Sequence, residues 1–204
     1  MKCLIDNDIL MCLAAFDLIE EALDVIQVTV HETFVLQSAQ YKIAKLSKGY
    51  GTDAVERALE FVKSASKISN NPTYFETVSR VAVDGIDAGE LMLLAESLDH
   101  PVILLATGDK RFLKAFASSE THAAARDHLR RRVVCLEYVV RLIIDRHGFE
   151  YVRDRIVPQR ECNTSMKTAF GSGRLATLEN VLASLEYKLR ELVEETGDLL
   201  LTDF

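Results

Sequence analysis

The 204-residue sequence lacks the segments that would place it in a membrane or a secretory pathway. No apolar run approaches the ~20 residues needed to span a bilayer. The first segment does not form a signal peptide, because Asp6, Asp8 and Asp17 interrupt its apolar part. The four cysteines show no paired metal-ligand spacing, and a reduced, cytoplasmic protein is the simplest interpretation.

Signatures of covalent catalysis and of base stacking are also missing. No Ser-His or Cys-His pattern marks a nucleophile, and the five histidines are scattered along the chain. Aromatic residues make up 7% of the sequence and are not interleaved with cations, so no base-stacking platform is evident. The net charge of −7 is the opposite of what nucleic-acid binding favours.

The composition nevertheless predicts a well-packed globular protein. The sequence is 49% hydrophobic and 27% charged, which allows a full core to be buried. Its length fits one domain, or one domain with an appendage.

The most informative stretch runs from residue 86 to residue 116. Asp87 opens an apolar-periodic segment that predicts a helix, and a turn at 99–101 ends that helix. The continuous apolar run from Val102 to Ala106 then predicts a strand that is covered on both faces. Asp109 follows this strand, and ligands of open parallel sheets gather where strands end.

The same arrangement recurs twice near the N-terminus. A strand is predicted over residues 2–5 and is followed by Asp6, and a second is predicted over residues 25–30 and is followed by Glu32. A last strand is predicted over residues 133–137, and a turn at 70–72 is predicted to lead into a short helix ending at Val83. Helices between the strands imply a three-layer α/β/α fold with a central, mainly parallel sheet.

Beyond Gly148 the pattern is helical, and we predict a boundary there. Residues 1–147 would form the α/β domain, and residues 148–204 a helical C-terminal extension. The extension contains a seam of leucines at three- and four-residue spacing, namely Leu175, Leu178, Leu182, Leu185, Leu189 and Leu192. We expect this 175–192 seam to be buried on its own domain, with a homodimer or a regulatory protein partner as the alternative.

The segments that carry the acids are LIDNDIL (4–10), VTVHETFV (28–35), IDAGELMLLA (86–95) and LLATGDKRFL (104–113). In this order they resemble the four acidic motifs of PIN domains, compact nucleases that cut RNA with divalent metal and include the toxins of toxin–antitoxin pairs. The resemblance covers roughly residues 1–145. It implies a catalytic set whose members are Asp6, Glu32, Asp87 and Asp109.

The chain departs from the PIN pattern at two positions. Asp8 stands where many members have asparagine, so it is a candidate additional metal ligand. Arg111 stands where many members have an acid, so it removes a ligand and adds a phosphate contact. Thr107 matches the hydroxyl residue that usually comes two positions before the last acid.

Carboxylate chemistry supports a metal independently of the resemblance. Converging carboxylates repel one another without a cation, and Mg²⁺ or Mn²⁺ prefers oxygen ligands. Taken alone, each acid also has a structural explanation. Asp87 with Glu90 has the spacing of a capping box, Asp8 and Asp109 precede or begin helices, and Glu32 suits a first helical turn.

The cations are concentrated in the middle of the chain. Residues 105–174 contain 14 Lys and Arg against 8 Asp and Glu. We predict an RNA phosphate track beside the metal, formed by Lys110, Arg111, Lys114, Arg130, Arg131 and Arg132. For the arginines at 130–132, a solvated helix end is an alternative.

Two other functions compete with an endoribonuclease. Asp6-Asn7-Asp8 and Thr107 also fit a phosphohydrolase that resembles haloacid dehalogenases, with Gly197-Asp198 as a faint match to that family's last motif. That interpretation leaves Glu32 and Asp87 unexplained. The second competitor is a PIN-like scaffold that binds RNA or protein without cutting.

Overall fold

A computed structural model describes residues 1–68 and 86–202 of the chain. In this part a five-stranded, all-parallel sheet has the strand order β3-β2-β1-β4-β5. The strands are β1 (Lys2–Ile5), β2 (Thr33–Val35), β3 (Ser66–Lys67), β4 (Ile103–Ala106) and β5 (Val133–Val134). The predicted turn at 70–72 and helix to Val83 lie outside the described residues.

The pairing of β1 with β4 brings the N-terminus beside the middle of the sequence. β1 and β4 pair in register from Lys2 opposite Ile103 to Ile5 opposite Ala106, and the ladder continues where the Asp6 N–H donates to the Ala106 carbonyl at 2.9 Å. Because the strands are parallel, the residues that follow each one emerge at the same edge of the sheet. We call this edge the carboxyl edge.

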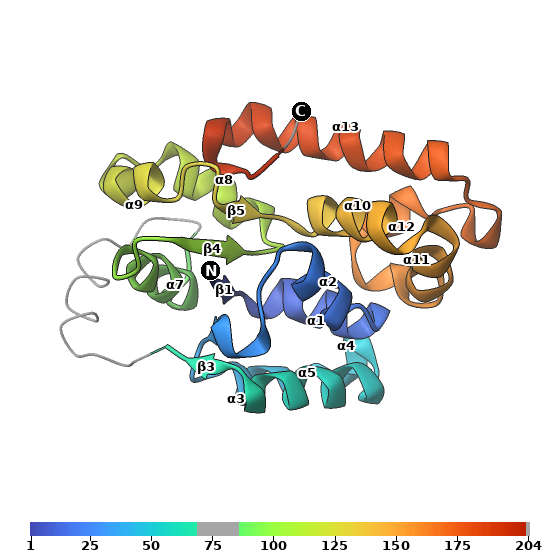
Figure 1. Ribbon diagram of the computed structural model, residues 1–204, viewed down its shortest axis with the longest axis horizontal. Helices are drawn as coiled ribbons and strands as arrows, with labels where there is room; N and C mark the ends of the chain where they lie inside the picture. Colours follow the sequence, from blue (N-terminus) through green and yellow to red (C-terminus); the bar gives the residue numbers. More distant parts are fainter. Residues whose placement is uncertain (69–85, 203–204) are drawn as a thin grey trace.

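Helices lie on both sides of the sheet, which confirms the predicted α/β/α class with a helical C-terminal part. Figure 1 shows α5 and α3 along one side of the molecule and α13 along the other. The helices are α1 (Asn7–Phe16), α2 (Ile19–Val25), α3 (Ala39–Ile43), α4 (Ser47–Tyr50), α5 (Thr52–Ser64), α7 (Ala88–Leu98), α8 (Lys110–Ser118), α9 (Ala123–His128), α10 (Leu136–His147), α11 (Phe149–Ile156), α12 (Thr164–Ala169) and α13 (Leu178–Thr196). Short 3-10 turns are η1 (Val30–Glu32), η2 (Glu120–His122), η3 (Val157–Cys162), η4 (Gly173–Leu175) and η5 (Gly197–Leu199).

The predicted strands agree with the structure at β1 and nearly so at β4, which begins one residue later than expected. The strand predicted over residues 25–30 is wrong, because α2 continues to Val25 and Gln27 adopts a left-handed backbone with φ 57°. Thr29 and Glu32 then form a capping box that starts η1, and the strand follows only at Thr33. The last predicted strand shortens to two residues, because α10 begins at Leu136.

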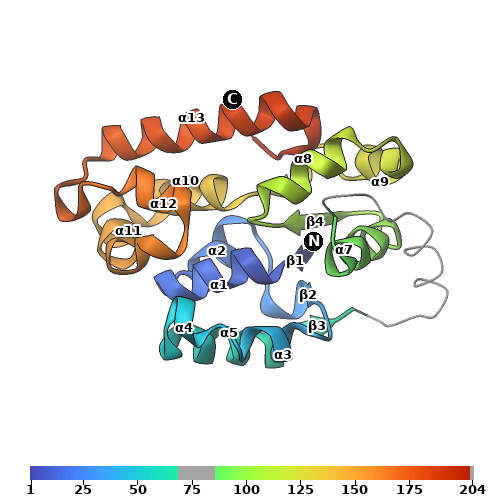
Figure 2. The same ribbon diagram turned by 180° about the vertical axis from the view of Figure 1, so that it is seen from behind.

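The part of the chain after Gly148 shares the hydrophobic core of the first part. Gly148 has φ 92° at the junction of α10 and α11, and Val152, Ile156 and Phe170 beyond it are fully buried in one continuous core. α13 packs on α8, α10 and α12, and Figure 2 shows it from behind, running along this side of the molecule. The chain then returns to the sheet, where the Leu201 N–H donates to the Val133 carbonyl at 2.8 Å.

The predicted leucine seam is buried over its second half. Leu185, Leu189 and Leu192 are 0–2% exposed and pack on the chain's own domain. Leu175 is 85% exposed, because it lies in η4 before α13 begins, and Leu178 is 43% exposed. Self-packing is therefore confirmed for the second half of the seam and wrong for Leu175.

In residues 1–68 and 86–202, no helix combines the length and the apolar character needed to cross a membrane.

Candidate acidic site at the carboxyl edge of the sheet

Asp6 stands at the end of β1 and is the most enclosed acid of the site. It is the N-cap of α1, and it is only 9% exposed. One carboxylate oxygen accepts the Asn7 N–H at 2.7 Å, and the other accepts the Thr107 hydroxyl at 3.2 Å. Burial, reinforced by the nearby Asp8 charge, raises the pKa of Asp6 to about 6.

Thr107 and Asp109 follow β4 at the same edge. The fully buried Thr107 hydroxyl donates to Asp6 and accepts the Asp109 N–H at 3.2 Å, so it joins the two acidic segments. Asp109 caps α8 by accepting the Arg111 and Phe112 N–H groups at 2.8 and 3.1 Å. Its side chain is 16% exposed.

Asp87 and Glu90 come from the start of α7. They form the predicted capping box: Glu90 N–H donates to Asp87 at 2.8 Å, and Asp87 N–H donates to Glu90 at 2.6 Å. Gly89 between them is closely surrounded, since a Cβ there would lie 3.0 Å from Leu36 and 3.1 Å from the Asp87 carboxylate. A larger residue at position 89 would have to displace one of these side chains where α7 packs against the segment that follows β2.

The five acids come from the starts of α1, α7 and α8, and their charges act on one another. We call Asp6, Asp8, Asp87, Glu90 and Asp109 the acidic cluster. Burial raises the pKa of Glu90 to about 7, and the charges of three other members add to this effect. Burial and the neighbouring Asp109 and Asp87 charges likewise raise the pKa of Asp8, although its side chain is exposed.

Two cations border the acidic cluster. Lys42 from α3 places its Nζ 4.0 Å from the Asp87 carboxylate, and Arg111 places its Nη2 3.4 Å from the Asp109 carboxylate. Both side chains are largely exposed, with Arg111 at 90%. Both also oppose the rise in the Asp8 pKa, so they offset part of the local negative charge.

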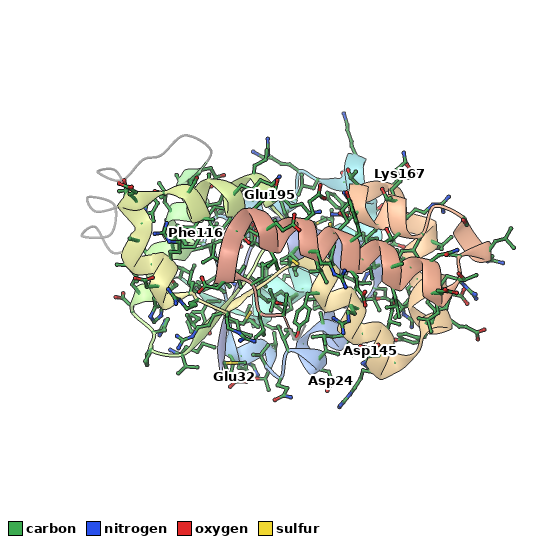
Figure 3. The ribbon with its side chains drawn as sticks, turned by 90° about the horizontal axis from the view of Figure 1, so that it is seen from above. Asp24, Glu32, Phe116, Asp145, Lys167 and Glu195 are labelled. Atoms are coloured by element: carbon green, nitrogen blue, oxygen red, sulfur yellow. The ribbon has the colours of Figure 1, made fainter. Side chains whose placement is uncertain are left out.

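Glu32 lies apart from the acidic cluster, so the structure does not bring it together with the other three acids of the predicted catalytic set. It comes before β2 rather than after it, so it lies at the amino edge of the sheet. Its carboxylate accepts the terminal amino group of Met1 at 2.8 Å and the Thr29 N–H at 2.9 Å, and these bonds lower the pKa of Glu32 to about 2. Figure 3 shows Glu32 on the same side of the molecule as Asp24 and Asp145.

Most of the predicted phosphate track is engaged elsewhere. Lys110 turns inward, with Nζ 2.6 Å from the buried Glu137 carboxylate and 2.8 Å from the Ser165 hydroxyl. Lys114 pairs with Glu195 of α13 at 2.6 Å. These two lysines therefore connect elements of the fold.

The three arginines at 130–132 are also misplaced for a track beside the acids. They precede β5, and so lie at the amino edge of the sheet. Arg131 and Arg132 donate to the carbonyls of Thr202 and Pro101, and Arg130 pairs with Asp198 at 3.1 Å. Of the six predicted track residues, only Arg111 stands at the acidic cluster.

Two residues of this region, Glu90 and Lys42, are not among the site residues predicted from the sequence. Glu90 was considered only as a capping residue, although its capping-box spacing marks it as close to Asp87. Lys42 carries no sequence signal, because its approach to Asp87 depends on where the fold places α3.

The donor atoms of the acidic cluster suit Mg²⁺ or Mn²⁺, which take oxygen ligands. Each carboxylate oxygen has two lone pairs, so the capping bonds leave acceptor capacity on Asp6, Asp87 and Asp109. The side chains are nevertheless not arranged as a complete metal site: among the described residues, no group of three Asp, Glu, His or Cys side chains is placed to hold a metal ion. Two surface cavities of about 630 and 720 Å³ lie apart from the acidic cluster, around α2.

Comparison with known proteins leaves the family open: no protein-family model, curated protein or solved structure matches the chain.

Proposed function

We propose that the protein is a PIN-like hydrolase, an endoribonuclease that cuts single-stranded RNA with Mg²⁺ or Mn²⁺. The observation that supports this is the gathering of five carboxylates at the carboxyl edge, where the pKa values of three of them, Asp6, Asp8 and Glu90, are raised. A buried Asp6 and a buried Glu90 with raised pKa values are expected of a site that a bound cation completes.

Asp6, Asp87 and Asp109 would hold the metal, with Asp8 as a further ligand at the exposed side. A bound divalent ion would polarise the scissile phosphate and lower the pKa of the attacking water. Thr107 orients Asp6 through its hydroxyl bond, so it acts as a positioning residue. Glu32 has no role in this scheme, and Glu90 holds the Asp87 backbone in place.

RNA phosphates would meet Arg111 and Lys42 at this site, rather than the longer track predicted from the sequence. Both cations are exposed and stand within 4.0 Å of a cluster carboxylate. The Arg111 guanidinium and the Lys42 ammonium can exchange their carboxylate partners for phosphate oxygens. A cytoplasmic setting suits the four free cysteines, and an antitoxin-like or regulatory protein partner remains part of the proposal.

One observation favours a second candidate, the non-catalytic scaffold. Lys42 and Arg111 neutralise part of the cluster in the way that a metal would, so the cluster can persist without one. The dehalogenase-like alternative loses support, because Gly197-Asp198 lies at the amino edge beside Arg130 and Arg131.

Cleavage of a labelled single-stranded RNA in the presence of Mn²⁺ tests the proposal. Asp6→Asn and Asp109→Asn should each abolish cleavage while the fold is kept, since asparagine can still cap a helix. Glu32→Gln is the matched control, a carboxylate removed from the opposite edge, and should cut normally. Failure of the wild-type chain to cut, with Mn²⁺ bound, would favour the scaffold. Hydrolysis of p-nitrophenyl phosphate that is lost only in Asp6→Asn would favour the phosphohydrolase.

A further inference from the structure

Two cysteines that are 150 positions apart in the sequence lie close together where η3 packs on α1. Cys12 lies in α1 and is 4% exposed, whereas Cys162 is the last residue of η3 and is partly exposed. Their thiols are close enough to shift each other's pKa, Cys12 upward and Cys162 downward. The neighbouring Asn163 amide also donates to the Cys12 sulfur at 3.8 Å, so the approach of η3 to α1 is fixed at two adjacent residues.

The surroundings of this thiol pair differ from those of the other cysteines. Cys3 lies inside β1 and Cys135 directly after β5, where they are 0% and 2% exposed, and burial raises the pKa of Cys3 to about 12. Contact with Cys12 instead lowers the pKa of Cys162. Cys162 therefore combines access to solvent with a lowered pKa, and both properties favour thiol reactivity.

We propose that Cys12 and Cys162 form a reversible intramolecular disulfide when the protein meets a hydroperoxide. The Cys162 thiolate attacks the peroxide oxygen, which forms a sulfenic acid on Cys162 and releases an alcohol, or water from hydrogen peroxide. The Cys12 sulfur then attacks the sulfenic sulfur, and the departing hydroxide takes the Cys12 proton to leave as water. Two thiols are oxidised, one peroxide is reduced, and a dithiol reductant reverses the change.

The disulfide would fasten η3 to the helix that begins at the acidic cluster. α1 starts directly after Asp6 and carries Asp8 in its first turn. The cross-link would close most of the chain into one loop, which restricts the unfolded state strongly. Its formation does not depend on the proposed nuclease activity, so it can be tested whatever the activity is.

Intact-mass and peptide mapping of the full chain tests the proposal. The reduced protein is treated with a slight excess of hydrogen peroxide, and remaining thiols are blocked with N-ethylmaleimide. We expect a mass loss of two hydrogens, two fewer blocked thiols and a peptide joining Cys12 to Cys162. The melting temperature should rise by an amount on the order of 10 °C and return to its starting value with dithiothreitol.

Two kinds of variant make the result specific. Cys12→Ser should trap sulfenic acid on Cys162, detectable as a dimedone adduct, and Cys162→Ser should give no cross-link. Cys3→Ala and Cys135→Ala are the controls and should keep the cross-link. If Cys12→Ser does not fold, Cys162→Ser at the partly exposed position still decides the question. Folded wild-type protein that keeps four free thiols, or forms only disulfides between chains, overturns the proposal.

Discussion

Lys110 provides a sharp test of how the acidic site is anchored to the rest of the fold. It follows Asp109 directly, and its ammonium joins Glu137 of α10 at 2.6 Å and Ser165 of α12 at 2.8 Å. The Glu137 carboxylate is only 3% exposed, and the Lys110 ion pair lowers its pKa against the opposing effect of burial. Lys110→Met would leave this carboxylate buried without its cation.

The expected cost follows from the burial of the pair. Removing one partner of a buried ion pair costs about 3–5 kcal/mol. Since the Lys110 side chain is 34% exposed, we expect the lower end of this range, about 3 kcal/mol. In a chain of this length that corresponds to a fall in melting temperature of about 6–12 °C.

Lys114→Met is the matched control. Its pair with Glu195 has the same length of 2.6 Å, but the two side chains are 47% and 40% exposed. An exposed pair contributes roughly 0–1 kcal/mol, so this variant should melt within about 4 °C of wild type. Thermal unfolding followed by circular dichroism measures both variants.

A double variant separates burial of charge from loss of packing. Lys110→Met with Glu137→Leu removes both charges and should recover much of the loss, because a hydrophobic pair can replace a buried ion pair. Equal melting temperatures for Lys110→Met and Lys114→Met would refute the reasoning, because burial would then make no difference to the energy of two ion pairs of equal length.

Two further predictions concern stability. The folded-state pKa values of Asp6 and Glu90 are raised, so their ionisation destabilises the fold. The free energy of unfolding of the metal-free protein, measured with urea, should therefore rise by on the order of 3 kcal/mol when the pH is lowered from 8 to 5. Asp6→Asn should show a smaller rise. A free energy of unfolding that falls as the pH is lowered from 8 to 5 would contradict the burial of these acids. Leu189→Ala in α13 should lower the free energy of unfolding by about 2–5 kcal/mol, and Leu175→Ala in η4 by less than about 0.5 kcal/mol, because of the two only Leu189 is buried. Similar losses in the two variants would show that Leu175 is buried as well.

The strands that could be predicted are those whose apolar run ends at a strong local signal. β1 ends at Ile5, directly before Asp6, and β4 ends before Thr107-Gly108-Asp109, so the predicted bounds of both agree with the structure to within a residue. The run from Val25 to Val30 has the same composition, but the chain turns within it at Gln27. β-branched residues favour a strand wherever the chain is extended, but their composition does not predict where the chain turns.

The same physical reason explains which site residues were found. Asp6 and Asp109 follow parallel strands, and Asp87 begins the helix that leads back to the start of β4. Their positions relative to neighbouring strands in the sequence therefore predict that all three lie at one edge of the sheet. Glu32 precedes its strand, which sends it to the opposite edge. Lys42 reaches Asp87 only through the packing of α3, an arrangement that no local pattern contains.

The central claim, that the acidic cluster holds a divalent ion, is tested most directly by a crystal soaked in manganese and measured for anomalous scattering. We predict a peak with carboxylate oxygens of Asp6 and Asp109 within ~2–2.6 Å, and with the Asp87 carboxylate turned away from Lys42. The same soak of Asp6→Asn crystals should show a weaker peak or none. A wild-type crystal at saturating manganese without a peak among these carboxylates, or with its only peak at the opposite edge near Glu32, would contradict the account.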